Sequence, residues 1–157
     1  MKLGVFALAL IAFATLGIRQ SAAADRLQAL SYLVGSWHCT YRVGATVQSY
    51  GAVFAFTQGG NWLHETDTWS GGGDEGYYTF DPTHHLWTVD VLDSGRGTTV
   101  LHGPDLGASK LDLRSVLPNG GLHTVTVKVD ATHFTVAATQ TTASGSTTSN
   151  DRCTKTP

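Results

Sequence analysis

The sequence has 157 residues, a formal net charge of −2 and no cluster of basic residues. A chain of this length forms one domain that is large enough to bury its own core. A surface that binds nucleic acid or an anionic membrane needs concentrated positive charge. The composition therefore excludes both as electrostatic partners.

The N-terminus has the features of a secretory signal peptide. Lys2 precedes an apolar run from Leu3 to Gly17, and the small residues Ser21–Ala24 resemble a cleavage site. The run is shorter than the roughly 20 residues of a membrane-spanning helix, so a retained anchor is the less favoured alternative. We predict that residues 1–24 are removed and that residues 25–157 are exported to the periplasm or the extracellular space, without a membrane partner. Loss of the two basic residues of the leader lowers the basic total from 10 to 8 against 12 acids, a net charge of −4.

The exported part contains two cysteines, Cys39 near its start and Cys153 near its end. In one small domain of an oxidising compartment, thiols are more often paired than free. A shared zinc ion is the alternative, but no histidine flanks Cys153 at the short spacing typical of zinc ligands. We therefore predict a disulfide and no metal site.

Helical periodicity is confined to one short segment, 26–33, in which Leu27, Leu30 and Leu33 share a face. The rest divides into short segments rich in Thr, Val and aromatic residues, separated by Gly, Asp, Pro and Asn. The ten predicted strands are 36–43, 47–58, 61–69, 75–81, 85–93, 96–102, 108–117, 121–129, 133–140 and 146–154. Their short connections allow hairpins only, because a parallel crossover needs about a dozen residues. The sequence thus predicts an all-β fold, a single antiparallel up-and-down barrel of about ten strands, in which closure removes the exposed edges.

Alternating apolar and polar residues predict which side chains face the barrel interior. In strand 108–117, Leu111 and Leu113 alternate with charged residues. In the next two strands the inner residues are predicted to be Val125, Val127, Val129, Phe134, Val136 and Ala138. His123 shares the parity of the valines, so we expect its imidazole in the lumen, whereas we expect His133 to face outward. A one-residue bulge would reverse either assignment.

A short helix followed at once by Gly35-Ser36-Trp37 resembles the start of calycin barrels, which include lipocalins, fatty-acid-binding proteins, avidins and nitrobindin-like proteins. In those barrels the tryptophan packs at the closed end beneath a basic side chain of the last strand. The resemblance assigns these structural roles to Trp37 and Arg152. First and last strands are neighbours in a closed meander, so Cys39 and Cys153 would fasten the seam between them.

A closer resemblance is to small exported bacterial proteins of unknown function. These begin with Leu-x-Gly-x-Trp and carry Gly-Tyr-x-x-x-Asp-Pro before a Trp-rich strand. The matching segments here are Leu33–Trp37, Gly60–Glu65, Gly76–Pro82 and Trp87–Asp90. They extend over most of the exported part at low density, and they imply a fold without implying an activity.

The segment 61–69, NWLHETDTW, holds the densest mixture of polar and aromatic residues. If Trp62 and His64 face inward, an indole and an imidazole suit a flat ligand with a polar edge. If Glu65 and Asp67 face inward, mutual repulsion raises the pKa of at least one carboxyl group, which suits acid–base chemistry. The sequence leaves both orientations open.

We predict a non-enzymatic barrel that binds or carries a small, partly apolar ligand in its lumen. The candidate ligand-binding residues are Trp62, His64, Trp69, Trp87 and His123, with Tyr50, Phe54 and Phe56 as further aromatic candidates. The alternative is an isomerase or cyclase that uses Glu65 with His64 or His123, although no known nucleophile, zinc-protease or phosphate-loop motif supports it. In a third alternative, side chains fill the lumen, but ten strands usually enclose more space than side chains occupy.

Haem is a further alternative. The resemblance to nitrobindin-like barrels implies an iron-binding histidine in the last strand, but the segment 145–154 contains no histidine. His123 would have to replace it in a different geometry. Haem is therefore disfavoured, and we predict no cofactor.

Overall fold

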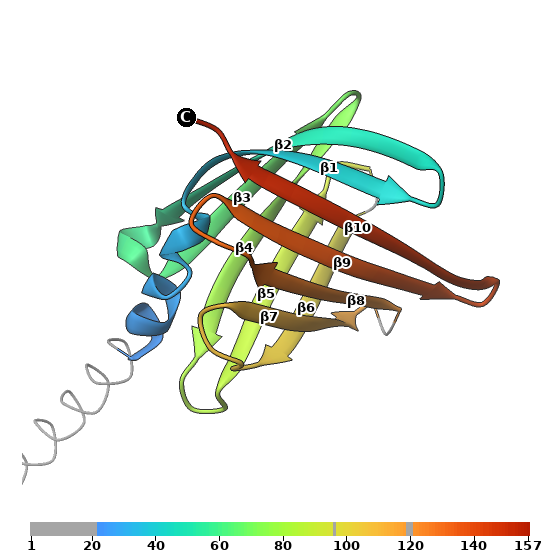
Figure 1. The fold of residues 1–157 in the computed structure, drawn as a ribbon. Coiled ribbons are helices and arrows are strands. Elements are labelled where there is room, and N and C mark those ends of the chain that lie inside the picture. The colour runs from blue at the N-terminus through green and yellow to red at the C-terminus, as the bar shows by residue number, and fades with distance from the viewer. Residues whose placement is uncertain (1–21, 96, 119–120) are drawn as a thin grey trace, which may run out of the picture.

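The computed structural model describes residues 22–95, 97–118 and 121–157. Within these residues, ten antiparallel strands close into one barrel in which each strand pairs with its neighbours in sequence and β1 pairs with β10 (Figure 1). The strands are β1 (Gly35–Val43), β2 (Thr46–Thr57), β3 (Trp62–Trp69), β4 (Gly72–Asp81), β5 (Leu86–Asp93), β6 (Gly97–Pro104), β7 (Lys110–Leu117), β8 (Leu122–Lys128), β9 (His133–Thr142) and β10 (Gly145–Lys155). The predicted up-and-down barrel is confirmed, and each predicted strand overlaps one observed strand.

A short N-terminal helical segment covers one end of the barrel (Figure 1). Residues 22–28 are helical, and a turn leads into the 3₁₀ turn η1 (Ser31–Leu33). Leu27, Leu30 and Leu33 are fully buried in the core, as their shared face predicts. In the described part of the chain, no helical segment has the length and apolar character needed to cross a bilayer. The signal peptide stays a prediction, because residues 1–21 lie outside the described residues.

The barrel end next to the helix, here called the closed end, is filled by a packed apolar core. Among its buried side chains are Trp37, Phe54, Leu63, Phe80, Trp87, Leu113 and Phe134. The rings of Trp37 and Phe134 meet edge to face at 4.8 Å between centroids, and those of Phe80 and Trp87 lie 5.0 Å apart. Side chains therefore fill this half of the lumen, and any ligand space lies toward the opposite end, here called the open end.

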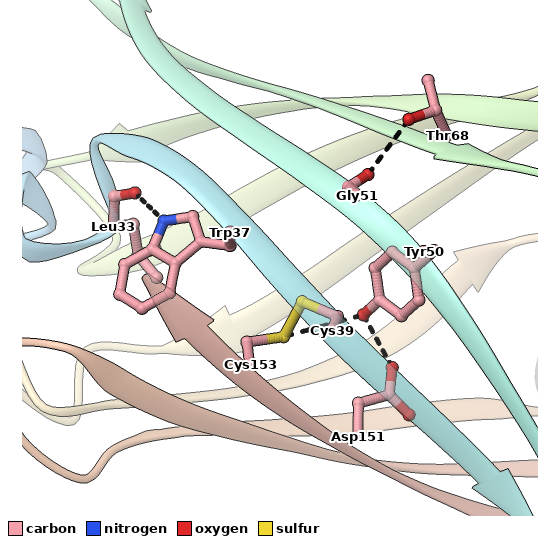
Figure 2. Close-up of a disulfide and its surroundings, with 8 residues drawn as sticks. All are labelled: Leu33, Trp37, Cys39, Tyr50, Gly51, Thr68, Asp151 and Cys153. Carbon is pink, nitrogen blue, oxygen red and sulfur yellow. Dashed lines mark hydrogen bonds between the residues drawn. A yellow bond between two sulfur atoms is a disulfide. The ribbon is translucent and has the colours of Figure 1, made fainter. Parts of the chain in front are cut away.

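The predicted disulfide between Cys39 and Cys153 is present and joins the first strand to the last (Figure 2). The two residues are direct cross-strand partners in the β1–β10 ladder, with 4.1 Å between their Cα atoms. Both side chains are buried on the inner face. The bond fixes the register of the seam from inside the barrel.

Trp37 lies at the closed end as predicted, but its basic neighbour is Lys155 rather than Arg152. Trp37 and Lys155 are cross-strand partners, and the Lys155 Nζ lies 5.2 Å from the centroid of the indole. Arg152 directly precedes the inward-facing Cys153 in β10, so its side chain points outward and is exposed. The Trp37 Nε1 donates a hydrogen bond of 2.6 Å to the carbonyl of Leu33, which ties the strand to the helical cap (Figure 2).

The predicted inner face of β8 is wrong, whereas that of the flanking strands is right. Leu111 and Leu113 are buried, and they pair with Thr126 and Thr124 of β8. Because directly paired residues share a face, the threonines point inward and His123 points outward with the valines. The outward valines are Val125 and Val127 in the strand, followed by Val129 just beyond it.

The inner face of β8 was predicted from the alternation of valine and threonine. That alternation is a weak signal, because the two side chains have the same β-branched shape and similar strand propensity. Val127 and Val129 are 38% and 61% exposed, which agrees with an outer position. In β9, Phe134 is buried and His133 is exposed, as predicted. Register with a neighbouring strand, rather than local apolar pattern, decides the face of β8.

Replacing both cysteines, Cys39→Ala with Cys153→Ala, should lower the free energy of unfolding by about 4 kcal/mol. The chain-entropy treatment of a cross-link predicts this magnitude for a loop of roughly 100 residues, and the two cysteines lie 114 residues apart. Urea unfolding followed by circular dichroism measures the loss. The adjacent outer pair His38→Ala with Thr154→Ala, also cross-strand partners, is the control and should change stability far less. Equal losses in both double variants would contradict a seam held by the disulfide.

Removing the cation above Trp37 should destabilise the closed end. We expect Lys155→Ala to lower the free energy of unfolding by about 1 kcal/mol through loss of the cation–π contact and of side-chain packing, and to change the tryptophan fluorescence. Arg152→Ala, three residues away on the outer face, should stay within about 0.5 kcal/mol of the parent protein. The opposite ranking of the two variants would restore Arg152 to the role that the sequence predicted.

Candidate functional site

The open end of the barrel contains a cavity of about 530 Å³. This volume lies within the range of small-molecule sites, roughly 300–1,000 Å³. The cavity is lined by three aromatic residues, four aspartates and a rim of small or amide residues: Tyr41, Tyr50, Trp69, Asp67, Asp74, Asp93, Asp151, Gln48, Ser49, Gly71, Gly72, Ser94 and Gly95. The site is thus both aromatic and strongly acidic.

Strand β3 presents its acidic face to the lumen, which decides between the two orientations that the sequence left open. Leu63 of β3 is fully buried in the closed-end core, and Glu65 pairs with the inward-facing Phe54 of β2. Asp67 and Trp69 follow on the same face and line the cavity. The side chains of β3 therefore change from apolar to acidic to aromatic between the closed end and the open end.

Three aspartates on consecutive strands form one cross-strand row. Asp67 of β3 pairs with Asp74 of β4, and Asp74 pairs with Asp93 of β5. Like charges directly opposite each other in a ladder repel, and burial removes the water that would screen them. Burial and the charge of Asp93 raise the pKa of Asp74 to about 6. Burial, followed by the charges of Glu65, Asp74 and Asp151, raises the pKa of Asp67 to about 9.

Glu65 lies one step deeper in the lumen than this row. Burial raises its pKa to about 7, although the hydroxyl of Tyr78 donates a hydrogen bond to Glu65 Oε2 and opposes the shift. The residue paired with Glu65 on β4 is Gly76, where an added Cβ would lie 3.0 Å from Glu65 Oε2. A glycine at this position makes room for the carboxyl group. Near neutral pH, Glu65 and Asp67 therefore hold protons on a substantial fraction of the molecules.

Tyr50 and Asp151 close the site on the seam side, next to the disulfide (Figure 2). The Tyr50 hydroxyl donates a hydrogen bond of 2.8 Å to Asp151 Oδ2. Burial raises the pKa of the Asp151 carboxyl group, while this hydrogen bond lowers it. The other carboxylate oxygen, Oδ1, is buried without a hydrogen-bond partner, as is Oδ1 of Asp67. Both residues line the cavity, so two acceptor atoms of the site lack a donor from the residues that the structure describes.

The lysines on inward-facing positions of the described strands lie at the closed end. Lys128 Nζ lies 4.9 Å from the ring centroid of Tyr32, and Lys155 lies over Trp37. Among the described residues, no three histidine, cysteine or acidic side chains are close enough together to hold a metal ion. The acidic cavity therefore receives no compensating lysine from the described strands and has no arrangement suited to a single ion.

Of the ligand-binding residues predicted from the sequence, only Trp69 and the additional candidate Tyr50 line this cavity. Trp87 is buried in the closed-end core, where Phe54 also lies and against which Phe56 packs. Trp62 and His64 belong to the outer face of β3, since Leu63 and Glu65 face inward. The predicted grouping of five ligand residues is therefore not formed.

The two histidines proposed as partners of Glu65 lie outside the barrel. The ring of His64 stacks on that of Tyr77 at 4.5 Å, and its Nε2 lies 3.4 Å from Glu75 Oε2. His123 Nε2 lies 2.8 Å from Asp112 Oδ1 on the outer face of β7 and β8. Acid–base catalysis by Glu65 with either histidine is therefore inconsistent with the strand parity.

Haem does not fit the lumen either. His38, His64, His102, His123 and His133 occupy outward positions in their strands. The remaining two, His84 and His85, lie in the turn between β4 and β5. No histidine of the described residues is therefore placed to bind iron inside the barrel, and the haem alternative is not carried further.

The candidate site residues that the sequence analysis missed are Asp74, Asp93 and Asp151, which line the cavity. A signal for the first two was present, because each lies beside a glycine-rich turn, at 71–73 and at 95–97. Asp67 precedes the same turn as Asp74. The up-and-down order places both turns at one end of the barrel, so the acidic positions flanking them indicate a common site.

Comparisons with known proteins identify no family for this chain. The sequence matches no protein-family model, and it matches no curated protein. Among solved structures, the chain is similar to a redesigned β-barrel, b11L5F_LGL, with 16% identity over 82% of this chain and 96% of that chain and a TM-score of 0.49. A similarity at this level carries no argument about function.

The acidic site should make the protein more stable at mildly acidic than at mildly alkaline pH. A carboxyl group with a pKa raised by folding contributes stability that is complete below its unfolded pKa and is lost as pH rises through its folded pKa. For Asp74, Glu65 and Asp67 the folded pKa values are about 6, 7 and 9, so the loss extends from about pH 4 to pH 9. Asp81 and Asp130, whose pKa values are lowered to about 2, lose their stabilisation below this window.

The melting temperature at pH 5, 7 and 9 measures this slope. Asp67→Asn should reduce the fall between pH 7 and pH 9, because it removes the group with the highest pKa in the row. Asp90→Asn is the control, since Asp90 lies on the outer face of β5, opposite Tyr77. A melting temperature that rises from pH 5 to pH 9 would show that these carboxyl groups ionise normally in the folded protein.

Proposed function

We propose that this protein is an exported, calycin-like barrel that binds and carries a small, partly apolar ligand in the cavity at the open end. The observation that carries the proposal is the division of the lumen into a filled half and a hollow half. Protein interiors pack densely, and a cavity lined by aromatic side chains is the usual form of a small-molecule site. The disulfide at the seam is compatible with export.

The packed closed end gives the cavity a rigid floor. Trp37, Phe54 and Phe134 form a continuous aromatic cluster below the disulfide, with 6.1 Å between the rings of the two phenylalanines. Tyr78, which packs against this core, contacts Glu65 at the level of the cavity floor. A ligand that enters from the open end therefore meets polar atoms set on an ordered apolar support, as a selective binding site requires.

Binding is favoured over catalysis by what the cavity contains. A nucleophile positioned by a base would indicate a covalent mechanism. The residues that line the cavity include the hydroxyl groups of Ser49 and Ser94, but no histidine or lysine among them could activate a serine. The proposed pairing of Glu65 with a histidine is absent from the lumen. Ligand binding needs only the shape and polarity that are present.

Filling the cavity mouth should block binding. We expect N-phenyl-1-naphthylamine, a neutral aromatic fluorophore, to gain fluorescence with the parent protein. Gln48→Trp places a large side chain in the lining and should weaken the affinity by about tenfold, a loss of about 1.4 kcal/mol. Val47→Trp is the matched control, because Val47 is the neighbouring residue on the outer face of β2 and is already 47% exposed.

Native mass spectrometry of the full chain, purified without denaturation, provides a second measurement. A retained small molecule that is lost in the Gln48→Trp variant supports the proposal. Equal fluorophore affinity in both tryptophan variants, together with an empty protein mass, would leave the cavity without a binding role.

A further inference from the structure

We infer that the ligand is an organic cation, with an ammonium group seated between the carboxyl groups of Asp67 and Asp151 and an apolar body against Tyr50 and Trp69. This inference rests on the proposed function and specifies its ligand class. It follows from three observations at the cavity: two buried acceptor atoms without donors, the arrangement of the acidic groups, and the aromatic wall.

The first observation concerns the two Oδ1 atoms of Asp67 and Asp151. Both atoms are buried, neither accepts a hydrogen bond, and both residues line the cavity. A buried polar atom without a partner costs about 1–3 kcal/mol. The second oxygen of Asp151 is already occupied by the Tyr50 hydroxyl. An ammonium group carries several N–H donors, so one ligand group can supply the donors that the described part of the chain does not.

The second observation is the spread of the acidic groups. Asp67 lies on β3, Asp74 on β4 and Asp151 on β10, and among the described residues no three such groups are close enough together for a metal ion. A small, compact cation would contact only part of this wall. A larger cation with N–H donors and an apolar body matches a cavity of about 530 Å³.

The third observation is the aromatic wall formed by Tyr41, Tyr50 and Trp69. The face of an aromatic ring attracts a cation within about 6 Å, and tryptophan does so most strongly. Glycine at position 72 leaves room for the Trp69 ring, because an added Cβ there would lie 3.0 Å from Trp69 Nε1. The wall thus offers a cation favourable contacts next to the carboxyl groups, since Tyr41 pairs with Asp151 and Trp69 follows Asp67 on the inner face of β3.

A positive ligand also relieves the repulsion in the acidic row, and a neutral ligand does not. Among the described residues, the titratable groups around Asp67 in the lumen are Tyr41 from β1, Tyr50 from β2, Glu65 from β3, Asp74 and Tyr78 from β4, Asp93 from β5 and Asp151 from β10. All of them are acids. The charge of a bound ammonium group therefore replaces protons on these carboxyl groups, and binding near neutral pH releases protons to the solvent.

Three probes of similar size and different charge test the ligand class. Isothermal titration calorimetry at pH 7.5 compares 2-phenylethylammonium, 2-phenylethanol and phenylacetate. We expect the ammonium compound to bind at least about tenfold more tightly than the alcohol, because hydrogen bonds to a charged partner are the stronger ones, and phenylacetate to bind most weakly. Repeating the titration in HEPES and in phosphate, which differ in ionisation enthalpy and contain no primary ammonium ion that would compete for the site, measures the released protons.

Variants separate recognition of charge from mere filling of the cavity. Asp67→Asn and Asp151→Asn should each weaken 2-phenylethylammonium by about tenfold and change the binding of 2-phenylethanol little. Asp90→Asn, on the outer face, should leave all three affinities unchanged. Circular dichroism and the intact disulfide show whether each variant is folded, and the alcohol serves as an internal measure of an intact cavity.

The outcomes distinguish this inference from the proposed function. Equal or tighter binding of the alcohol or of phenylacetate overturns the organic cation and leaves ligand binding in place. The same holds if none of the three probes binds while N-phenyl-1-naphthylamine does. If the fluorophore also fails to bind and the native mass is empty, the proposed function is overturned together with the inference.

Discussion

The register of the β1–β10 seam is the constraint on which the rest of the structure depends. Pairing Cys39 with Cys153 sets which residues of the first and last strands face inward, and the antiparallel ladders pass this parity to every other strand. A slip of one residue would exchange the two faces of the barrel. The same register places Asp151 inside, two residues from the disulfide and within reach of Tyr50. The β1–β10 register therefore both closes the barrel and brings the residues of the site together.

Each strand that forms the site changes chemical character along its length. In β3 the inward residues run from Leu63 through Glu65 to Asp67, and in β10 they run from Cys153 to Asp151. The apolar ends meet beneath the helical cap and form the core. Each Å² of apolar surface buried there stabilises the barrel by about 25 cal/mol. The acidic ends of the strands oppose stability. Each strand runs from the core to the acidic site, so packing in the core keeps the repelling carboxyl groups close together.

The fold could be predicted from the sequence because strand segments, glycine-rich turns and short connections are local features. The disulfide could be predicted because only two cysteines are present. Local features failed wherever the inner and outer faces have similar character. In β8, Val125 and Thr126 differ little in shape or strand preference, so only pairing with Leu111 identifies the inner residue. The acidic row was missed for a different reason. The glycine-rich turns place Asp67 and Asp74 at one end of the barrel, but the direct pairing of the two residues follows only from the β3–β4 register.

The carboxyl groups of the open end are difficult to explain as structural residues. A barrel selected for stability alone would replace Asp67 with an apolar residue, which would remove the repulsion and the unpartnered oxygen together. Proteins tolerate such local cost where function requires it, and they offset it elsewhere. Here the offset is available in the buried seam disulfide and in the aromatic core below it. The position of the destabilising groups, gathered around one cavity rather than scattered through the lumen, argues that they serve a ligand.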